Sequence, residues 1–426
     1  NGCRGVGRCS HGFCACPPGR WGLDCGLHVG SPGLPGAPEA PRPRVHVLQT
    51  PAPFRRACVP WVLPELFGDA LLRSPHAVPD PAGADYVWLY GCPLAGSGLM
   101  QALAHARGAT PLWEASARDG RARHLLLAPS EHGYAEGWQA AWMGQRDASM
   151  PENVRPGQPF YAQVAPESPA RLVGSLQLEG AADVRFKKEK PPCHICFQRG
   201  KDLMVPAFRR VNDYPTARDC ARLRAGLSPW SDAAAAAPEG PRDTRLFFAR
   251  AIHTRKDVQP SRAWPYATAR SEPGFRILQT ERHPNVVDPS APGFSAQVDL
   301  YAELRRAQAC MVPMGKTGNY GQRMVPAALA GCIPVSTKAK GSAQPMDEAL
   351  PWARFSLAAP HDGGESLAAA VGRLDGPTRA AMRAELGCAW RRLLWTRFYG
   401  PCVGTERLEA GEADAFAATL DALARR

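Results

Sequence analysis

Short apolar runs separated by amphipathic, helix-compatible stretches recur along most of this chain. Runs of about five apolar residues bounded by turn residues predict strands that are covered on both faces, as in a parallel sheet. In the first half of the chain such runs lie at 45–49, 85–90, 124–128, 172–178 and 203–205. Their alternation with helical segments predicts an α/β domain with a mainly parallel sheet.

The same alternation resumes in the second half of the chain. It predicts strands at 245–249, 275–279, 309–313 and 332–336, helices at 300–307 and 366–374, a helical stretch ending near Leu329, and a largely helical region from Thr378 onward. Between the halves, polyalanine bounded by proline and charged residues at 228–242 indicates an interdomain linker. We therefore expect an N-terminal domain at 45–227, a C-terminal domain at 243–400 and a helical tail at 401–426.

The first 28 residues follow a different pattern, which is dominated by cysteine and glycine. Their five cysteines are separated by five, four, one and eight residues and are Cys3, Cys9, Cys14, Cys16 and Cys25. This spacing lacks the paired Cys-x-x-Cys units of zinc sites, so it favours disulfides over zinc and an oxidising compartment over the cytosol. The Pro/Gly-rich stretch that follows, at 29–44, indicates a linker.

Composition and charge narrow the possible partners. The chain has 426 residues, 45% of them hydrophobic, which is enough for two large domains and a small one. No apolar run approaches the roughly 18 residues of a membrane span, so we expect any targeting or anchoring segment upstream of Asn1. The net charge of +12 favours anionic partners. Basic residues are scattered and no nucleic-acid motif occurs, so nucleotide diphosphates or acidic glycans fit better than nucleic acid, and a merely solubilising basic surface is the alternative.

The clearest candidate chemistry lies in the segment CMVPMGKTGNYGQRMVPAALAGCIPVS at 310–336. Its pattern predicts a strand, a glycine-rich turn, a helix and a second buried strand. Gly315, Gly318 and Gly321 allow the backbone to turn tightly and to approach a ligand closely. The helix N-terminus and Arg323 would both favour a diphosphate. A turn that only packs is the alternative.

Two common phosphate-binding motifs do not fit this segment. A Walker A motif ending at Lys316 would need glycine at position 310, which is Cys310. The dinucleotide fingerprint G-x-G-x-x-G does not match the glycine spacing either. The segment therefore indicates anion binding of another type.

The run at 309–335, followed by QPMDEALPW at 344–352 and FSL at 355–357, resembles the C-terminal signature of exostosin-family glycosyltransferases. The pentapeptide Gly-Cys-Ile-Pro-Val at 331–335 matches that signature in full. Further stretches that resemble the family, in the same order, lie at 80–90, 123–133, 200–206 and 245–249. The resemblance therefore extends from about residue 45 to residue 400.

The resemblance implies a fold, which is α/β and GT-B-like, with two Rossmann-like lobes that contain parallel sheets. The N-terminal cysteines resemble an EGF-like module whose first cysteine precedes Asn1, a small disulfide-rich unit that occurs ahead of such domains in this family. That module implies bridges Cys3–Cys14 and Cys16–Cys25. The partners of the other cysteines stay open, namely those of Cys9, Cys58, Cys92, Cys193, Cys196, Cys220, Cys310, Cys332, Cys388 and Cys402.

The resemblance also implies an activity, which is inverting transfer of a sugar from a nucleotide sugar to a polysaccharide or glycoprotein glycan. The acceptor would bind the first lobe and the donor the second, in the Golgi lumen or outside the cell. No Asp-x-Asp triplet occurs, so we expect neither a metal nor another cofactor. The donor diphosphate would contact residues of the glycine-rich turn and its helix, namely Gly315, Lys316, Gly318, Gly321 and Arg323.

Two positions bear on whether the chain is catalytic. Glu131 and His132 occupy the turn that matches the family's first-lobe active-site turn, so they are the candidate general bases, with a surface role as the alternative. Pro326 stands where the family commonly has an acidic residue that holds the ribose hydroxyls, and we expect it in the first turn of a helix that begins near Met324 or Val325. A non-catalytic scaffold or glycan-binding protein is therefore the second hypothesis.

Overall fold

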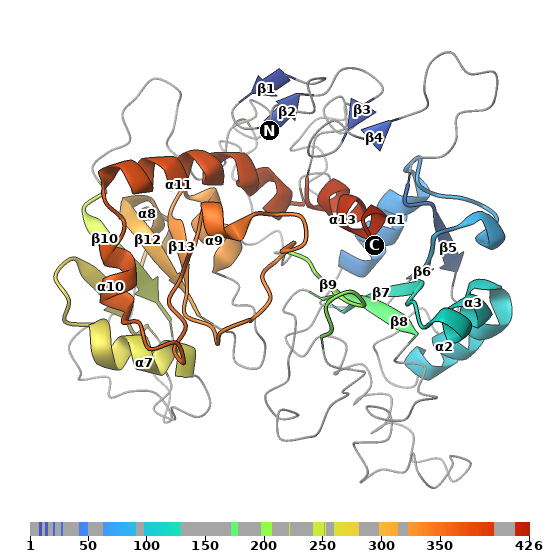
Figure 1. The fold of residues 1–426 in the computed structure, drawn as a ribbon, viewed down its shortest axis with the longest axis horizontal. Coiled ribbons are helices and arrows are strands. Elements are labelled where there is room, and N and C mark those ends of the chain that lie inside the picture. The colour runs from blue at the N-terminus through green and yellow to red at the C-terminus, as the bar shows by residue number, and fades with distance from the viewer. Residues whose placement is uncertain are drawn as a thin grey trace, which may run out of the picture. The chain divides into compact units, whose positions relative to one another are not determined.

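The chain forms two compact units, each built on its own five-stranded parallel sheet (Figure 1). One unit contains the described residues between 42 and 205 together with Phe416–Arg426, and the other contains those from Pro206 to Ala415. The structure, a computed structural model, describes residues 8–10, 13–15, 20–21, 27–28, 42–49, 63–90, 98–128, 172–177, 197–206, 221, 242–250, 252, 260–280, 298–313, 323–395 and 414–426.

The sheet of the first unit has its strands in the order in which they occur in the chain. They are β5 (Val45–Gln49), β6 (Tyr86–Tyr90), β7 (His124–Ala128), β8 (Val173–Gln177) and β9 (Leu203–Met204). The helical elements are α1 (Leu63–Leu72), η3 (Pro81–Gly83), α2 (Gly98–Ala109), α3 (Leu112–Asp119) and α13 (Ala415–Ala424). Every residue of β7 is buried, which explains why this strand is a continuous apolar run rather than an alternating one.

The last helix of the chain, α13, packs into the core of the first unit. The rings of Phe67 on α1 and Phe416 on α13 lie 4.9 Å apart, centroid to centroid. The hydroxyl of Tyr86 on β6 donates to the carbonyl of Leu423 at 3.1 Å. Because Phe416 and Leu423 are both almost fully buried, the first unit depends on residues from the far end of the sequence.

The sheet of the second unit has the strand order β11-β10-β12-β13-β14, so the order reverses between β10 and β12. The strands are β10 (Thr244–Ala249), β11 (Phe275–Leu278), β12 (Ala307–Val312), β13 (Ile333–Ser336) and β14 (Leu357–Ala358). The helical elements are α7 (Pro260–Ala269), α8 (Leu300–Arg306), α9 (Met324–Leu329), η8 (Trp352–Arg354), α10 (Leu367–Gly372), α11 (Gly376–Ala389) and η9 (Trp390–Leu393). This is the order of a doubly wound sheet with one topological switch point.

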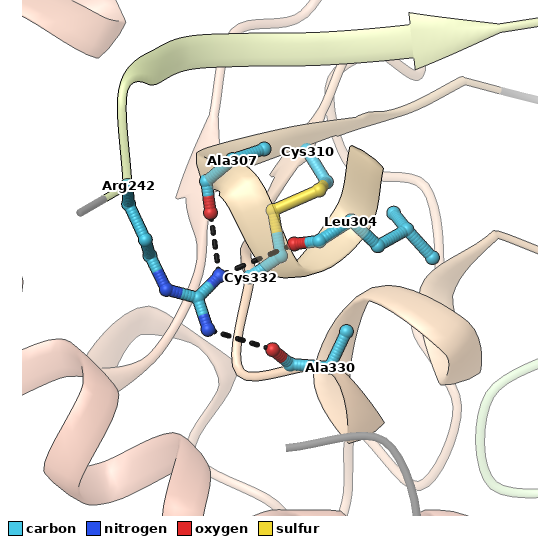
Figure 2. Close-up of a disulfide and its surroundings, with 6 residues drawn as sticks. All are labelled: Arg242, Leu304, Ala307, Cys310, Ala330 and Cys332. Atoms are coloured by element: carbon cyan, nitrogen blue, oxygen red, sulfur yellow. Dashed lines mark hydrogen bonds between the residues drawn. A yellow bond between two sulfur atoms is a disulfide. The ribbon is translucent and has the colours of Figure 1, made fainter. Parts of the chain in front are cut away.

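A disulfide between Cys310 and Cys332 joins β12 to the residue that precedes β13 (Figure 2). The turn before Cys332 explains the Gly-Cys pair, because Gly331 has a φ of 66°, which favours glycine. The amides of Gly331 and Cys332 bond back to the carbonyls of Ala328 and Ala327, so α9 ends in a Schellman motif that places the Cys332 sulfur beside β12.

Arg242 holds the elements around this disulfide together (Figure 2). Its Nη1 donates to the carbonyls of Leu304 at 3.2 Å and Ala307 at 2.6 Å, and its Nη2 donates to the carbonyl of Ala330 at 2.8 Å. These carbonyls belong to the end of α8, the start of β12 and the end of α9. One guanidinium therefore satisfies three backbone groups that helix ends would leave unpaired.

Short strands are also present near the N-terminus. They are β1 (Arg8–Ser10), β2 (Phe13–Ala15), β3 (Arg20–Trp21) and β4 (Leu27–His28), which pair as β1 with β2 and β3 with β4. The side chains of Cys3, Cys14, Cys16 and Cys25 lie outside the described part of the chain. The EGF-like module and its two bridges therefore stay predictions.

The expected fold class is confirmed: the chain is α/β and has two lobes with parallel sheets. Each expected strand is present, with ends that differ from the predicted ones by two residues at most. Among the described residues, no helix has both the length and the apolar character needed to cross a membrane.

Candidate functional site

The switch point in the second sheet locates the candidate site. In open parallel sheets, ligands bind outside the carboxyl ends of the strands where the strand order reverses. Here the two strands on either side of the reversal are β10 and β12, which end at Ala249 and Val312. The carboxyl end of β13, at Ser336, lies at the same edge because β12 and β13 pair in parallel.

Arg323 extends to this switch point from the segment that follows β12. Its Nη2 donates to the carbonyl of Ala249, the last residue of β10, at 2.7 Å. The side chain is half-buried, so the guanidinium is held in place without being sealed from solvent. A cation therefore lies where the glycine-rich sequence and the strand reversal independently predict an anion site.

The helix after Arg323 is short. As predicted, α9 begins at Met324 and has Pro326 in its first turn. All six of its side chains are buried, and its N-cap residue makes no side-chain hydrogen bond to the helix. A helix of one and a half turns has only a weak dipole, so the charge of Arg323 matters more at this position than the helix N-terminus does.

Three consecutive polar residues, all buried, lie at the carboxyl edge of the sheet: Ser336 ends β13, and Thr337 and Lys338 follow it. Lys338 is only 1% exposed, and its Nζ donates to the carbonyl of Ala343 at 3.3 Å and to Oε1 of Gln344 at 3.0 Å. The Nε2 of Gln344 donates to Oγ of Ser336 at 3.3 Å. Since a buried ammonium is costly unless it is hydrogen-bonded, these contacts give the Gln344 amide one orientation.

Thr337 links the same edge to two further elements. Its Oγ1 donates to the carbonyl of Ser261 at the start of α7, at 2.6 Å. Its carbonyl lies 3.0 Å from Nδ1 of His361, which follows β14. A carbonyl only accepts, so the proton of this imidazole lies on Nδ1 and Nε2 keeps a lone pair unless the ring is charged.

The segment after Gln344 is tightly folded. The indole Nε1 of Trp352 donates to the carbonyl of Pro345 at 2.7 Å. Met346 is buried and has a φ of 55°, a left-handed conformation that non-glycine residues seldom adopt. This is the stretch of sequence whose acidic and tryptophan pattern resembles the exostosin signature.

The other residues predicted for the site lie outside the described part of the chain. They are Glu131, His132, Gly315, Lys316, Gly318 and Gly321. Arg323 is the one predicted donor-site residue whose contacts the structure describes. The polar group at the end of β13 was not predicted from the sequence. Ser336 and Gln344 lie inside or next to the recognised motifs, whereas His361 had no sequence signal.

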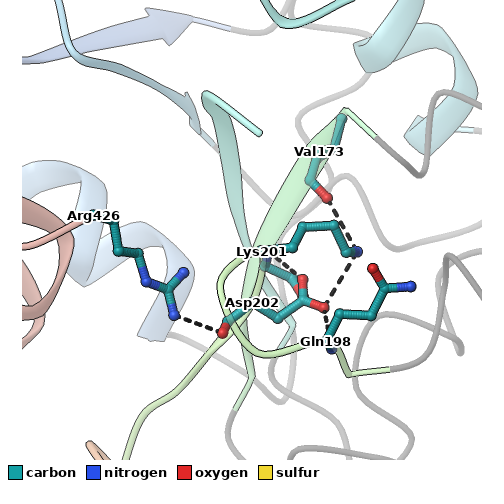
Figure 3. Close-up of polar contacts among 6 residues, drawn as sticks. Val173, Gln198, Lys201, Asp202 and Arg426 are labelled. Carbon is teal, nitrogen blue, oxygen red and sulfur yellow. Dashed lines mark hydrogen bonds and ion pairs between the residues drawn. The ribbon is translucent and has the colours of Figure 1, made fainter. Parts of the chain in front are cut away.

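The segment at 200–206, the first-lobe stretch that resembles the exostosin family, has a structural role (Figure 3). Oδ1 of Asp202 accepts hydrogen bonds from the amide and hydroxyl of Ser175 at 2.9 and 2.8 Å. Its Oδ2 accepts from the amide of Gln198 at 2.9 Å and pairs with Nζ of Lys201 at 3.2 Å. Arg426 on the segment after α13 donates to the Asp202 carbonyl at 2.7 Å. This buried carboxylate fixes β9 against β8.

His124, the first residue of β7, is fully buried at the amino side of the first sheet. Its Nε2 lies 2.8 Å from the hydroxyl of Thr110. Burial, with a smaller contribution from the nearby Arg123, lowers the pKa of His124 to about 4. The ring is therefore neutral near pH 7, and its burial at the amino end of β7 indicates a packing role.

No model of a protein family matches this chain, and no curated protein matches it. Among solved structures, it is similar to the sucrose-phosphate synthase tll1590 from Thermosynechococcus elongatus, with 14% identity over 80% of this chain and 73% of the other, at a TM-score of 0.35. CalG4, the calicheamicin glycosyltransferase, aligns at 15% identity over 79% of this chain and 76% of its own, at a TM-score of 0.30. Alr3699/HepE from Anabaena, in complex with UDP and glucose, aligns at 13% identity over 81% of this chain and 93% of its own, at 0.33.

Proposed function

We propose that this chain is an exostosin-type glycosyltransferase with a GT-B-like architecture, which transfers a sugar from a nucleotide sugar to a polysaccharide or glycoprotein glycan. The observation that carries the proposal is the contact of Arg323 with the last carbonyl of β10 at the switch point of the second sheet. The motif resemblance around that arginine supports the choice of a nucleotide sugar as the ligand.

The donor diphosphate would bind beside Arg323, against the glycine-rich turn that precedes it. A guanidinium that donates to a backbone carbonyl keeps its planar group in a defined orientation, and its positive charge attracts phosphate oxygens. When the bond between the sugar and the diphosphate breaks, negative charge grows on the leaving oxygen. A fixed cation at that position stabilises the transition state more than the ground state.

The transfer step would be inverting and independent of metal. Glu131 or His132 would remove the proton from the acceptor hydroxyl, whose oxygen attacks the anomeric carbon from the face opposite the diphosphate. The electron pair of the breaking bond leaves with the diphosphate. The sequence motif around Glu131 supports this assignment.

Nucleotide binding tests the proposal most directly. Arg323→Ala should weaken UDP or GDP binding by about 1.5–3 kcal/mol, the worth of a hydrogen bond to a charged group. Isothermal titration calorimetry measures the change, with Arg354→Ala as the control because that arginine is 66% exposed and lies 3.8 Å from Glu385. Equal binding by wild type and Arg323→Ala would contradict the donor site.

Pro326→Glu does not provide a clean test of the ribose contact. Pro326 is buried within α9, so glutamate at this position would place a carboxylate among apolar neighbours and would destabilise the unit. Arg323→Ala is therefore the sharper variant.

The second candidate function, a non-catalytic scaffold or glycan-binding protein, is favoured by Pro326 in place of the family's acidic residue. The two functions differ in one measurement. Absence of UDP and GDP binding at millimolar concentration would select the non-catalytic function.

We also propose that the protein works in an oxidising compartment, the Golgi lumen or the extracellular space. The disulfide between Cys310 and Cys332 supports this location, because such bonds persist mainly in oxidising compartments.

A further inference from the structure

At the end of β13, buried residues orient two half-buried polar side chains, Gln344 and His361, in a way that packing alone does not require. Gln344 and His361 come from different loops, yet both are oriented by three consecutive residues at the carboxyl edge. Lys338 and Ser336 orient the amide, and the carbonyl of Thr337 orients the imidazole. Gln344 and His361 are only half-buried, whereas the residues that orient them are buried.

The remaining hydrogen-bonding capacity of the two side chains is defined. The Gln344 amide uses one N–H for Ser336 and one lone pair of Oε1 for Lys338, so one donor and one acceptor remain. The His361 ring uses Nδ1 for the Thr337 carbonyl, so Nε2 is left as an acceptor. An amide that offers a donor beside an acceptor matches the edge of a nucleobase, and an imidazole acceptor matches a ribose hydroxyl.

The position of the pair along the sheet fits the same ligand. The switch point lies between β10 and β12, and β13 is the next strand beyond β12. Neighbouring strands are about 4.8 Å apart, so the end of β13 lies roughly 10 Å from the end of β10. A nucleotide whose diphosphate lies beside Arg323 would extend its nucleoside over the end of β13.

We propose that Gln344 and His361 bind the nucleoside part of the donor, with Gln344 contacting the base and His361 accepting from a ribose hydroxyl. Lys338 and Ser336 are positioning residues that hold the Gln344 amide in its binding orientation. This inference rests on the proposed function and adds the residues that distinguish a nucleotide from a bare diphosphate. In this chain, His361 would hold the ribose, which the acidic residue holds in the family where Pro326 stands here.

The test compares two probes, UDP and inorganic diphosphate, by isothermal titration calorimetry on the full chain. Gln344→Leu and His361→Asn should each weaken UDP binding by tenfold or more and should change diphosphate binding by less than twofold. His361→Asn is chosen because the asparagine amide can still donate to the Thr337 carbonyl while Nε2 is lost. Lys340→Ala, an exposed change in the same loop, is the control and should leave both affinities unchanged.

The positioning role has its own readout. Ser336→Ala and Lys338→Met should weaken UDP binding in the wild-type background and should cause no further loss in the Gln344→Leu background. Ser336→Ala removes only one hydroxyl, so the two backgrounds can still be compared with this variant if Lys338→Met does not fold.

The outcomes separate this inference from the proposed function. Folded Gln344→Leu and His361→Asn variants that keep the wild-type ratio of UDP to diphosphate affinity would overturn the inference, as would an equal loss for both probes. Wild-type protein that binds neither probe, or an Arg323→Ala variant that binds both normally, would overturn the proposed function instead and this inference with it.

Discussion

The two parallel sheets of this protein have the same number of strands, yet their main groups of buried polar residues lie at different strand ends. In the first sheet, the buried His124 and Asp202 lie at the first residue of β7 and just before β9, on the amino side. In the second sheet, Ser336, Thr337 and Lys338 lie at the carboxyl end of β13. The two sheets also differ in strand order: among the described strands, only those of the second sheet reverse their order. The proposed donor site thus belongs to the sheet whose strand order reverses, as expected for a ligand site in an open parallel sheet.

The two units also differ in what completes them. The first unit recruits α13 from the end of the chain, and the second is cross-linked by a disulfide between β12 and the start of β13. One unit therefore depends on distant sequence and the other on a short covalent loop. The following predictions test these differences.

The largest expected effect concerns the dependence of the first unit on α13. Phe416→Ala should lower the free energy of unfolding by about 4 kcal/mol, because it deletes a fully buried ring that packs on Phe67. Denaturant unfolding measures the loss, and hydrogen–deuterium exchange should show it in β5–β7 rather than in β10–β13. Arg425→Ala, an exposed change on the same terminal segment, is the control. An equal loss of protection in both sheets would contradict the idea that only the first unit depends on α13.

The disulfide should contribute somewhat less to the second unit. Replacing Cys310 and Cys332 together by serine should cost about 3 kcal/mol, since the bond closes a loop of 22 residues in the unfolded chain. Exchange should increase in β12 and β13 while the first sheet stays protected. A double variant as stable as the wild type would show that packing and Arg242 suffice to hold these strands.

The smallest expected effect is the pH dependence of the first unit. The pKa of His124 is about 4 in the folded chain against 6.5 for an ordinary histidine, so only the unfolded chain takes up this proton between those values. Stability contributed by this site is intact above pH 6.5 and is lost as the pH falls towards 4, by about 2 kcal/mol at pH 5. His124→Gln lacks this titration and can still contact Thr110. The stability difference between wild type and variant should therefore change by that amount between pH 7.5 and pH 5, and a constant difference would contradict the assignment.

The strands were predictable because each has a local signature. Runs such as Val45–Gln49 and His124–Ala128 are mostly apolar and are bounded by turn residues, which is the local pattern of a strand in a parallel sheet. The start of α9 was also predictable, because proline is tolerated only in the first turn of a helix. Arg323 followed from its place after the glycine-rich turn.

The remaining features depend on residues that are distant in sequence. The partner of Cys310, the association of α13 with the first sheet and the contact of His361 with Thr337 each join segments whose spacing has no recognisable pattern. The sequence alone determined most of the strands, the α/β class and the candidate anion-binding segment, because these arise from local periodicity and turn chemistry. The tertiary structure alone decided the strand order, the switch point and the residues that meet at it, because these depend on which segments pair across long stretches of chain.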